Sequence, residues 1–192
     1  MATISPTCRS STMAVIIEDT RQQAHKHDAK HAWWAAHGVE VLERDRALPF
    51  GDYMTEGSNV VVDTKRSIAE IAQNVTRDHR RFADECDRAR DAGYRLVVLV
   101  DAPARYETLP DLCAWMNDHC GACNVRRGGH CDPSTKGRCP RHKTVKPVQG
   151  PRLSSTLLKM ERDHGVRFEL CRREDAAKRI CELLGVSYDT DA

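Results

Sequence analysis

An acid and a lysine stand two positions apart at the end of a strongly apolar segment of this sequence. Three valines at 60–62 lead into Asp63 and then Lys65, and a further acid, Asp52, follows a Pro-x-Gly turn. Alternate side chains of a β-strand share a face, so Asp63 and Lys65 would lie side by side. Carboxylates are hard ligands that suit Mg²⁺. A bound cation activates water and holds a phosphate, while a lysine assists that water or the developing charge, which indicates phosphodiester hydrolysis.

The same pair also has a purely structural interpretation. Asp63 and Lys65 could end an edge strand as a surface ion pair, and the tripeptide Asp-x-Lys is common. The tripeptide therefore does not decide between the two interpretations. The order of the neighbouring motifs is more specific.

The motifs around this pair follow one another in the order of a known nuclease family. An apolar segment at 14–18 precedes Asp19 and Arg21, a Leu-Pro-Phe-Gly-Asp-Tyr motif occupies 48–53, and Asp63-Thr64-Lys65 comes next. In this order they resemble the nuclease domain of the XPF family, a branch of the PD-(D/E)xK nucleases. The resemblance implies a restriction-endonuclease-like α/β fold. It also implies that Asp19, Asp52 and Asp63 hold Mg²⁺ or Mn²⁺, with Lys65 beside the attacking water.

The chain departs from the family pattern at several positions. Asp63 stands where the family usually has Glu, Thr64 where it has Arg, and Gln22 where it has Glu. Asp keeps the charge of Glu on a shorter side chain, whereas the loss of Arg removes a possible phosphate contact. The tandem helix-hairpin-helix region of the family has no counterpart here, so we expect another element to hold DNA.

The expected activity is a metal-dependent DNA endonuclease. The family resemblance implies branched, flapped or otherwise structured DNA as the substrate, in recombination or repair, and a homodimer as the assembly. A non-catalytic, zinc-stabilised nucleic-acid-binding module is the alternative from another class, and a nuclease that acts on RNA is an enzymatic one. Because degenerate family members typically lose some of the site residues, the presence of Asp19, Asp52, Asp63 and Lys65 favours the enzyme.

Two further acids are open to two interpretations each. Glu70 follows Ser67 by three residues at a helix start, a spacing typical of a capping box. The family resemblance would instead place Glu70 near the metal. Asp101 ends an apolar segment at 96–100, where it is either a carboxylate that supports the metal site or the turn residue before Pro103.

A second group of potential ligands lies in a cysteine-rich segment. Cys120 and Cys123 form a C-x-x-C motif, and Cys131 and Cys139 follow at regular intervals. Four thiolates suit a tetrahedral structural Zn²⁺ site, with His130 or His142 as a substitute for one of them. Large apolar residues are almost absent from 121–146, so a metal would supply the folding energy. The alternative is a flexible loop with inert thiols.

Basic residues concentrate in the same segment, which we interpret as an insertion at 119–150. A cluster of positive charge is the electrostatic signature of phosphate binding, although a solvated basic loop is the simpler interpretation. The candidate DNA-binding residues are Arg126, Arg127, Arg138 and Arg141 in this segment, with Arg21, Arg77 and Arg81 elsewhere.

Strands and helices alternate along the sequence, which predicts an α/β fold with a mixed sheet covered on both faces. Glycines at 38, 93, 165 and 185 follow helical patterns, where C-terminal caps belong. The predicted strands are Val15–Glu18, Val39–Glu43, Val60–Asp63, Arg95–Val100 and Val166–Leu170. The predicted helices are Asp28–His37, Ser67–Asn74, Asp78–Ala92, Leu109–Asp118, Pro151–His164 and Arg173–Leu184.

Length and composition favour a single domain in a reducing compartment. The chain has 192 residues and a net charge of +2, and no apolar run approaches the roughly 20 residues of a membrane-spanning helix. Nine cysteines without a secretion signal indicate metal-bound or inert thiols rather than disulfides. We expect a disordered leader at 1–13, one nuclease domain at 14–192, and a cytoplasmic location.

Overall fold

The computed structural model describes residues 14–19, 27–43, 47–117 and 147–190 of the protein. Along the chain the elements are β1 (Ala14–Glu18), α1 (Asp28–Ala36), β2 (Val39–Glu43), β3 (Tyr53–Met54), β4 (Val60–Lys65), α2 (Ile68–Asn74), α3 (His79–Asp91), β5 (Arg95–Asp101), the 3-10 helix η1 (Leu109–Ala114), α6 (Gly150–His164), β6 (Arg167–Cys171), the 3-10 helix η3 (Arg173–Asp175) and α7 (Ala176–Leu184). All five predicted strands are present, which confirms the α/β class.

The strands form one mixed six-stranded sheet in the order β2-β1-β3-β4-β5-β6. The short strand β3 pairs antiparallel with β1 and with β4, whereas the other neighbouring pairs are parallel. Strands β4, β5 and β6 therefore end at the same edge of the sheet. In α/β proteins the carboxyl edge of parallel strands is where ligands bind.

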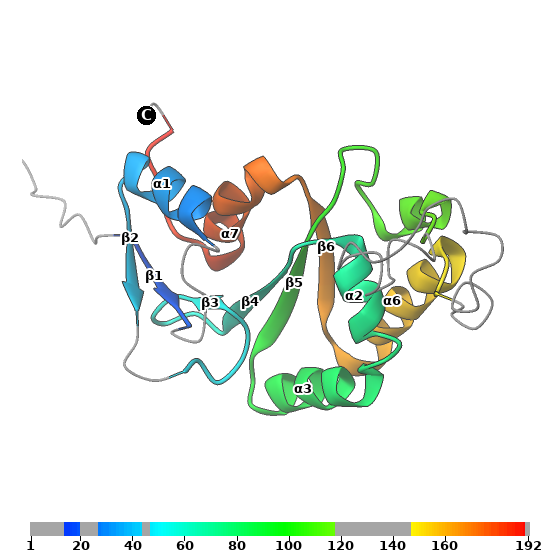
Figure 1. Ribbon diagram of the computed structural model, residues 1–192. Helices are drawn as coiled ribbons and strands as arrows, with labels where there is room; N and C mark the ends of the chain where they lie inside the picture. The colour runs from blue at the N-terminus through cyan, green and yellow to red at the C-terminus, as the bar shows by residue number, and fades with distance from the viewer. Residues whose placement is uncertain (1–13, 20–26, 44–46, 118–146, 191–192) are drawn as a thin grey trace, which may run out of the picture.

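Helices cover both faces of the sheet, as Figure 1 shows. On one face α2, α3 and α6 pack over Val61, Val98 and Val100, and on the other α1 and α7 pack over Val62 and Leu99. Strand β5 is buried from Leu96 to Val100 because both of its faces are covered. The valine-rich runs found in the sequence are thus the centre of the sheet.

The helix ends follow the local signals in the sequence. Gly165 and Gly185 adopt left-handed backbone conformations immediately after α6 and α7, as C-terminal caps require. The Ser67 hydroxyl accepts a hydrogen bond from the backbone N–H of Glu70 at the start of α2. The Glu70 carboxylate in turn accepts one from the N–H of Arg66, at 2.9 Å. Glu70 thus stabilises the start of α2 through the residue before the N-cap Ser67, and its predicted place near the metal stays a prediction.

Three elements differ from the sequence-based prediction. The helix predicted at 173–184 begins as the 3-10 helix η3, and α7 starts only at Ala176. The sequence did not predict strand β3, which has two residues and is too short for a hydrophobic pattern. The helix predicted at 109–118 is a 3-10 helix that ends at Ala114, and Trp115 continues with an extended backbone. Pro110 lies in the first turn of η1, where a residue without an N–H group is tolerated.

The chain on either side of residues 118–146 is held together. The backbone N–H of Asn117 donates to Oε1 of Gln149, and Nε2 of Gln149 donates to the carbonyl of Asn117, each at 3.1 Å. The N–H of Gly150 donates to the carbonyl of Trp115 at 3.0 Å. The segment thus leaves and rejoins the domain at one place. In the described parts of the chain, no helix is long and apolar enough to cross a membrane.

Candidate active site

Asp52 lies between the ends of β1 and β4 and is hydrogen-bonded to both sides. Its carbonyl accepts a hydrogen bond from the N–H of Asp19 at 2.9 Å, and its N–H donates to the carbonyl of Val62 at 2.8 Å. Asp52 is therefore next to the residue that precedes Asp63. Three segments far apart in the sequence thus bring Asp19, Asp52 and Asp63 to one edge of the sheet.

The Asp52 side chain extends the hydrogen bonding of β4 beyond the end of β3. Its Oδ2 accepts hydrogen bonds from the N–H of Thr64 at 2.9 Å and from the Thr64 hydroxyl at 2.6 Å. Thr64 thus positions the Asp52 carboxylate through both its backbone and its hydroxyl group. Gly51 makes the approach possible, because its φ is +64° and a Cβ there would lie 2.9 Å from the Val62 carbonyl oxygen.

Asp63 and Lys65 form an ion pair on the face of β4 that they share with Val61. Nζ of Lys65 lies 2.5 Å from Oδ2 of Asp63, and both side chains are mostly buried. Phe82 of α3 covers the lysine, since its ring centroid is 5.9 Å from Nζ. The side-by-side placement predicted from the alternation is confirmed.

Burial and neighbouring charges shift the protonation of this pair. Loss of solvent raises the pKa of Asp63 to about 7, although the nearby Lys65 favours the ionised form. Asp52 and Glu85 raise the pKa of Asp63 further by repulsion. Desolvation lowers the pKa of Lys65, but Asp63 outweighs it and the net shift is upward, so the lysine remains an ammonium group at neutral pH.

Asp19 is buried at the end of β1 with 2% of its surface exposed. Its Oδ2 accepts a hydrogen bond from the backbone N–H of Leu48 at 3.1 Å, and Leu48 packs in the core beneath α2 and α3. Asp19 thus connects the end of β1 to the turn before β3 through its side chain, and to Asp52 through its backbone N–H. Its predicted role as a third metal ligand stays a prediction.

The donor chemistry of the site fits a hard divalent cation. Within the described ranges, no group of three or more His, Cys, Asp or Glu side chains is arranged to hold a metal. Mg²⁺ does not require such a group, because it usually takes one or two carboxylates and completes its octahedron with water and substrate phosphate. Asp52 and Asp63 are two carboxylates that influence each other electrostatically. They fit a site of that kind.

The structure separates Asp101 from this group. In β5 it follows Leu99 by two residues, and Leu99 faces α1 and α7, so Asp101 lies on the opposite face from Asp63. Burial raises the pKa of Asp101, and the charges of Lys30 and Arg173 oppose that shift. The idea that Asp101 supports the metal therefore has no geometric basis, and its place is at the end of the strand.

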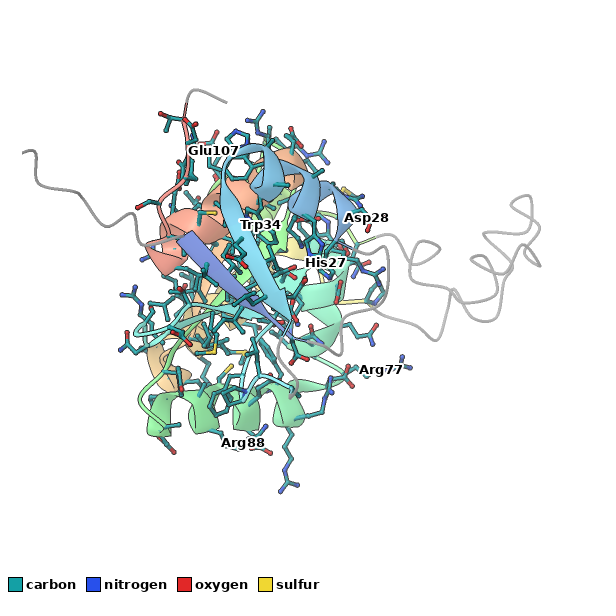
Figure 2. All side chains as sticks on the ribbon, turned by 90° about the vertical axis from the view of Figure 1, so that its left-hand side faces the viewer. His27, Asp28, Trp34, Arg77, Arg88 and Glu107 are labelled. Atoms are coloured by element: carbon teal, nitrogen blue, oxygen red, sulfur yellow. The ribbon has the colours of Figure 1, made fainter. Side chains whose placement is uncertain are left out.

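Two predicted DNA-binding arginines lie on the exterior near α3. Arg77 is exposed in the turn before the helix and projects away from the ribbon, as Figure 2 shows. Arg81 is exposed in the first turn of α3, next to the Phe82 that covers Lys65. Both are exposed, and their predicted contacts with DNA stay a prediction. Several predicted residues lie outside the described ranges: Arg21, Cys120, Cys123, Arg126, Arg127, Cys131, Arg138, Cys139 and Arg141.

The opposite face of the sheet has a polar cluster that the sequence did not indicate. Oε2 of the buried Glu18 lies 2.7 Å from Nε2 of His31, and the Tyr53 hydroxyl lies 2.7 Å from Nδ1 of His27. Trp34 packs edge-on against Tyr53 in the same layer. Figure 2 shows His27 immediately before α1 and Trp34 within it. These contacts fix α1 to β1 and β3 and thereby hold the strand ends that position the acids.

A pocket of about 590 Å³ adjoins the candidate site, and most of its residues had not been singled out. It lies beyond the carboxyl ends of β4, β5 and β6 and includes Arg66, Arg172 and Arg173, which directly follow two of these strands. The sequence signal for these arginines was their position after strand ends, and it becomes informative only when the strands are known to be parallel neighbours.

Comparison of the chain with family models and with curated proteins found no match.

Proposed function

We propose that the protein is a divalent-metal-dependent endonuclease that hydrolyses phosphodiester bonds in DNA. The observation that carries the proposal is the arrangement of Asp52, Asp63 and Lys65, in which two neighbouring carboxylates and a shielded ammonium group meet at one strand end. The motif order of the XPF-type and PD-(D/E)xK nucleases supports DNA as the substrate. Branched or flapped DNA, a role in repair or recombination, and a homodimer are the finer expectations from that resemblance.

Each residue has a distinct role in this proposal. Asp52 and Asp63 would hold Mg²⁺ or Mn²⁺, with Asp19 as the predicted third ligand. The bound cation would activate water and neutralise charge on the phosphate. Lys65, which the adjacent Asp63 keeps protonated, acts as a cation that stabilises developing negative charge rather than as the base. Phe82 limits the access of water to the ammonium group and so strengthens its field.

The decisive experiment measures the cleavage of labelled single-stranded, duplex, flap and junction DNA with Mg²⁺, with Mn²⁺ and with chelator. We expect cleavage with either metal and none with chelator. Asp63→Asn and Lys65→Ala should each lower the rate by about two orders of magnitude or more, as removal of one charge-stabilising group does. RNA versions of the same substrates test the alternative nuclease activity.

Glu169→Gln provides a matched control for Asp63→Asn. Glu169 lies in β6, is ion-paired with Arg179, and has the same 12% side-chain exposure as Asp63. Its substitution disturbs a comparable pair outside the site and should leave the cleavage rate near that of the wild type. If Asp63→Asn and Lys65→Ala cut as fast as this control, the site assignment is wrong. DNA binding without any cleavage would instead support the non-catalytic binding module.

A further inference from the structure

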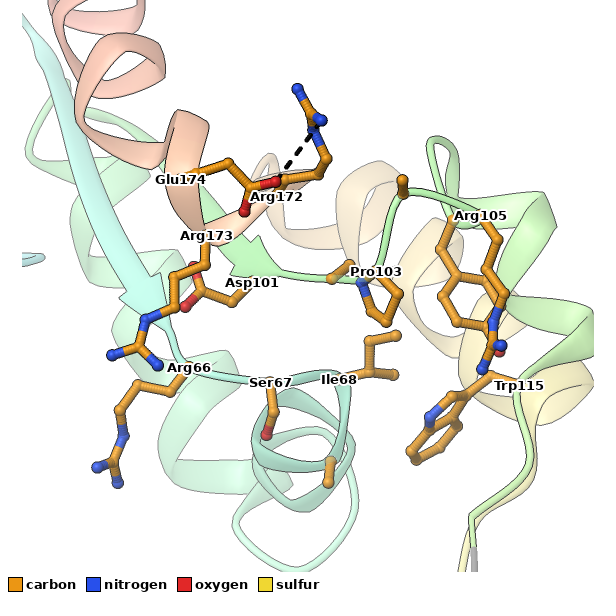
Figure 3. Close-up of a pocket in the computed structure, with 14 residues that line it drawn as sticks. Arg66, Ser67, Ile68, Asp101, Pro103, Arg105, Trp115, Arg172, Arg173 and Glu174 are labelled. Atoms are coloured by element: carbon orange, nitrogen blue, oxygen red, sulfur yellow. Dashed lines mark ion pairs between the residues drawn. The ribbon is translucent and has the colours of Figure 1, made fainter.

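The pocket beyond the strand ends combines an aromatic wall with a basic rim. Ile68 and Pro103 form its middle, Trp115 and Arg105 stand at one side, and Arg66 lies at the other, as Figure 3 shows. Its volume of about 590 Å³ is within the roughly 300–1,000 Å³ of small-molecule sites. The pocket is large enough for one nucleotide and offers both apolar and cationic contacts.

The positive charge of the pocket exceeds its negative charge. Four arginines line it, at 66, 105, 172 and 173, against the two acids Asp101 and Glu174. Arg172 binds Glu174 at 3.6 Å and Asp175 at 2.6 Å, so its charge is partly compensated. Arg105 lies over the ring of Tyr106, with its Cζ 4.9 Å from the centroid. Arg66 is largely exposed and is 3.7 Å from Glu70. The lining side chains thus carry a net positive charge, of which Glu70 and Asp175 outside the lining compensate a part, and arginines at a rim fit phosphate groups.

Trp115 is held in place by its backbone. Its N–H donates to the carbonyl of Leu112 at 2.9 Å, and its carbonyl accepts from the N–H of Gly150 at 3.0 Å. The indole is partly buried against the core and partly open to the pocket. Its packing against the core limits the side-chain freedom that a stacking ligand would take away, which favours binding.

The pocket begins one residue beyond the proposed catalytic lysine. Arg66 follows Lys65 directly, and Lys65 is paired with Val100, so Arg66 and Asp101 are neighbours at the strand ends. Alternation places Arg66 and Asp101 on the opposite face of the sheet from Asp63 and Lys65, so a strand of DNA whose phosphate lay at that pair would pass around the carboxyl edge of the sheet to place a nearby nucleotide in the pocket. A base can stack on a side chain only after it has left the duplex stack.

We propose that this pocket binds one unpaired nucleotide of the DNA substrate, with its base against Trp115 and its phosphates near Arg66 and Arg105. The inference rests on the proposed function, since that function supplies DNA as the ligand. It adds a preference for DNA with a single-stranded part. Such a strand can place one base in the pocket at little cost, whereas an intact duplex has to be opened first.

The test is a binding measurement in chelator, so that cleavage does not enter. The probes are a labelled 12-nucleotide single strand and a blunt duplex of the same sequence, measured by fluorescence anisotropy. Trp115→Leu keeps the apolar packing but removes the aromatic face, and it should weaken binding of the single strand by about tenfold or more. Trp115→Phe should keep most of the affinity, and duplex binding should not change.

Met116→Ala is the matched control, because Met116 is the next residue, is 84% exposed, and does not line the pocket. Arg66→Gln and Arg105→Gln should each reduce the salt dependence of single-strand binding by about 0.7 in the logarithmic slope. The pocket assignment fails if Trp115→Leu binds the single strand like Met116→Ala, or loses duplex affinity equally. If the wild type cleaves DNA but Trp115→Leu binds the single strand with unchanged affinity, the pocket assignment alone is wrong. If Trp115→Leu weakens single-strand binding but the wild type cleaves no DNA, the proposed hydrolase activity alone is wrong.

Discussion

At the scale of single residues, the site is built from groups that change each other's protonation. Asp63 is desolvated next to Lys65, and Asp52 adds repulsion from the neighbouring segment. The carboxylate therefore gains a pKa of about 7, whereas the lysine stays protonated. A cation and a proton would compete for Asp63 in the neutral range, so metal binding and pH are coupled at this residue.

The metal-free protein should lose stability as the pH rises toward 7. The folded-state pKa of Asp63 is about 7 against an ordinary value of 3.8, so the folded state binds more protons between these values. The contribution is fully present below pH 3.8 and is lost as the pH passes through about 7. It amounts to at most roughly 4 kcal/mol.

Urea unfolding in chelator from pH 4 to pH 8 measures this dependence. Asp63→Asn should flatten the curve, because its amide does not titrate, whereas Glu169→Gln should retain the slope. A slope that is equal in Asp63→Asn and the wild type would show that Asp63 is already ionised at low pH in the folded protein. Mg²⁺ should restore stability in the wild type above pH 7.

At the scale of elements, sequence patterns predicted the helices and strands that are long and have a periodic hydrophobic pattern. The β-branched run at 60–62 and the apolar run at 96–100 are the central strands, and the glycines at 165 and 185 end helices as expected. Strand β3 was missed because two residues have no period, although Asp52 of the site directly precedes it. Asp52 and Asp63 were linked only through the order of motifs. The pocket could not be predicted from the sequence, because its residues come together only through the order of the strands in the sheet.

The turn before β3 offers a test of how an element positions Asp52. Gly51 and Gly57 both have left-handed backbone angles, φ +64° and +76°, so alanine is strained at either position. A Cβ at Gly51 would also lie 2.9 Å from the Val62 carbonyl oxygen, whereas at Gly57 it would meet nothing within 4 Å. Gly51→Ala should therefore cost about 1–3 kcal/mol more than Gly57→Ala.

A loss of cleavage activity should occur in Gly51→Ala and not in Gly57→Ala. A shift of Gly51 moves Asp52, whose N–H and carboxylate both bond to β4, so cleavage should fall in Gly51→Ala beyond what its stability explains. Urea unfolding and cleavage rates of both variants provide the measurement. Equal rates for the two would mean that the position of Asp52 tolerates displacement of the turn.

At the scale of the whole molecule, the cysteine-rich segment joins the domain at a closed point. Asn117 and Gln149 bind each other on both sides of 118–146. Gly150 completes the closure, since a Cβ there would lie only 2.1 Å from the carbonyl oxygen of Leu112. A segment whose flanks are fixed to each other can be exchanged without a change in the path of the remaining chain. The predicted insertion can thus be separated from the domain by experiment.

Replacement of residues 118–146 by a short Gly-Ser linker should leave the α/β domain folded. The hydrogen bonds of Asn117, Gln149 and Gly150 lie outside the deleted part and continue to anchor η1 and α6. The deletion should remove the predicted Zn²⁺ at Cys120, Cys123, Cys131 and Cys139, about one per chain by elemental analysis. It should also reduce the salt dependence of DNA affinity, because clustered arginines leave with the segment.

A Cys120→Ser/Cys123→Ser variant separates the loss of zinc from the loss of positive charge, since it removes the metal but keeps every arginine. Unchanged zinc content in that variant would refute the predicted ligands, and unchanged DNA affinity in the deletion would leave phosphate binding to the domain itself.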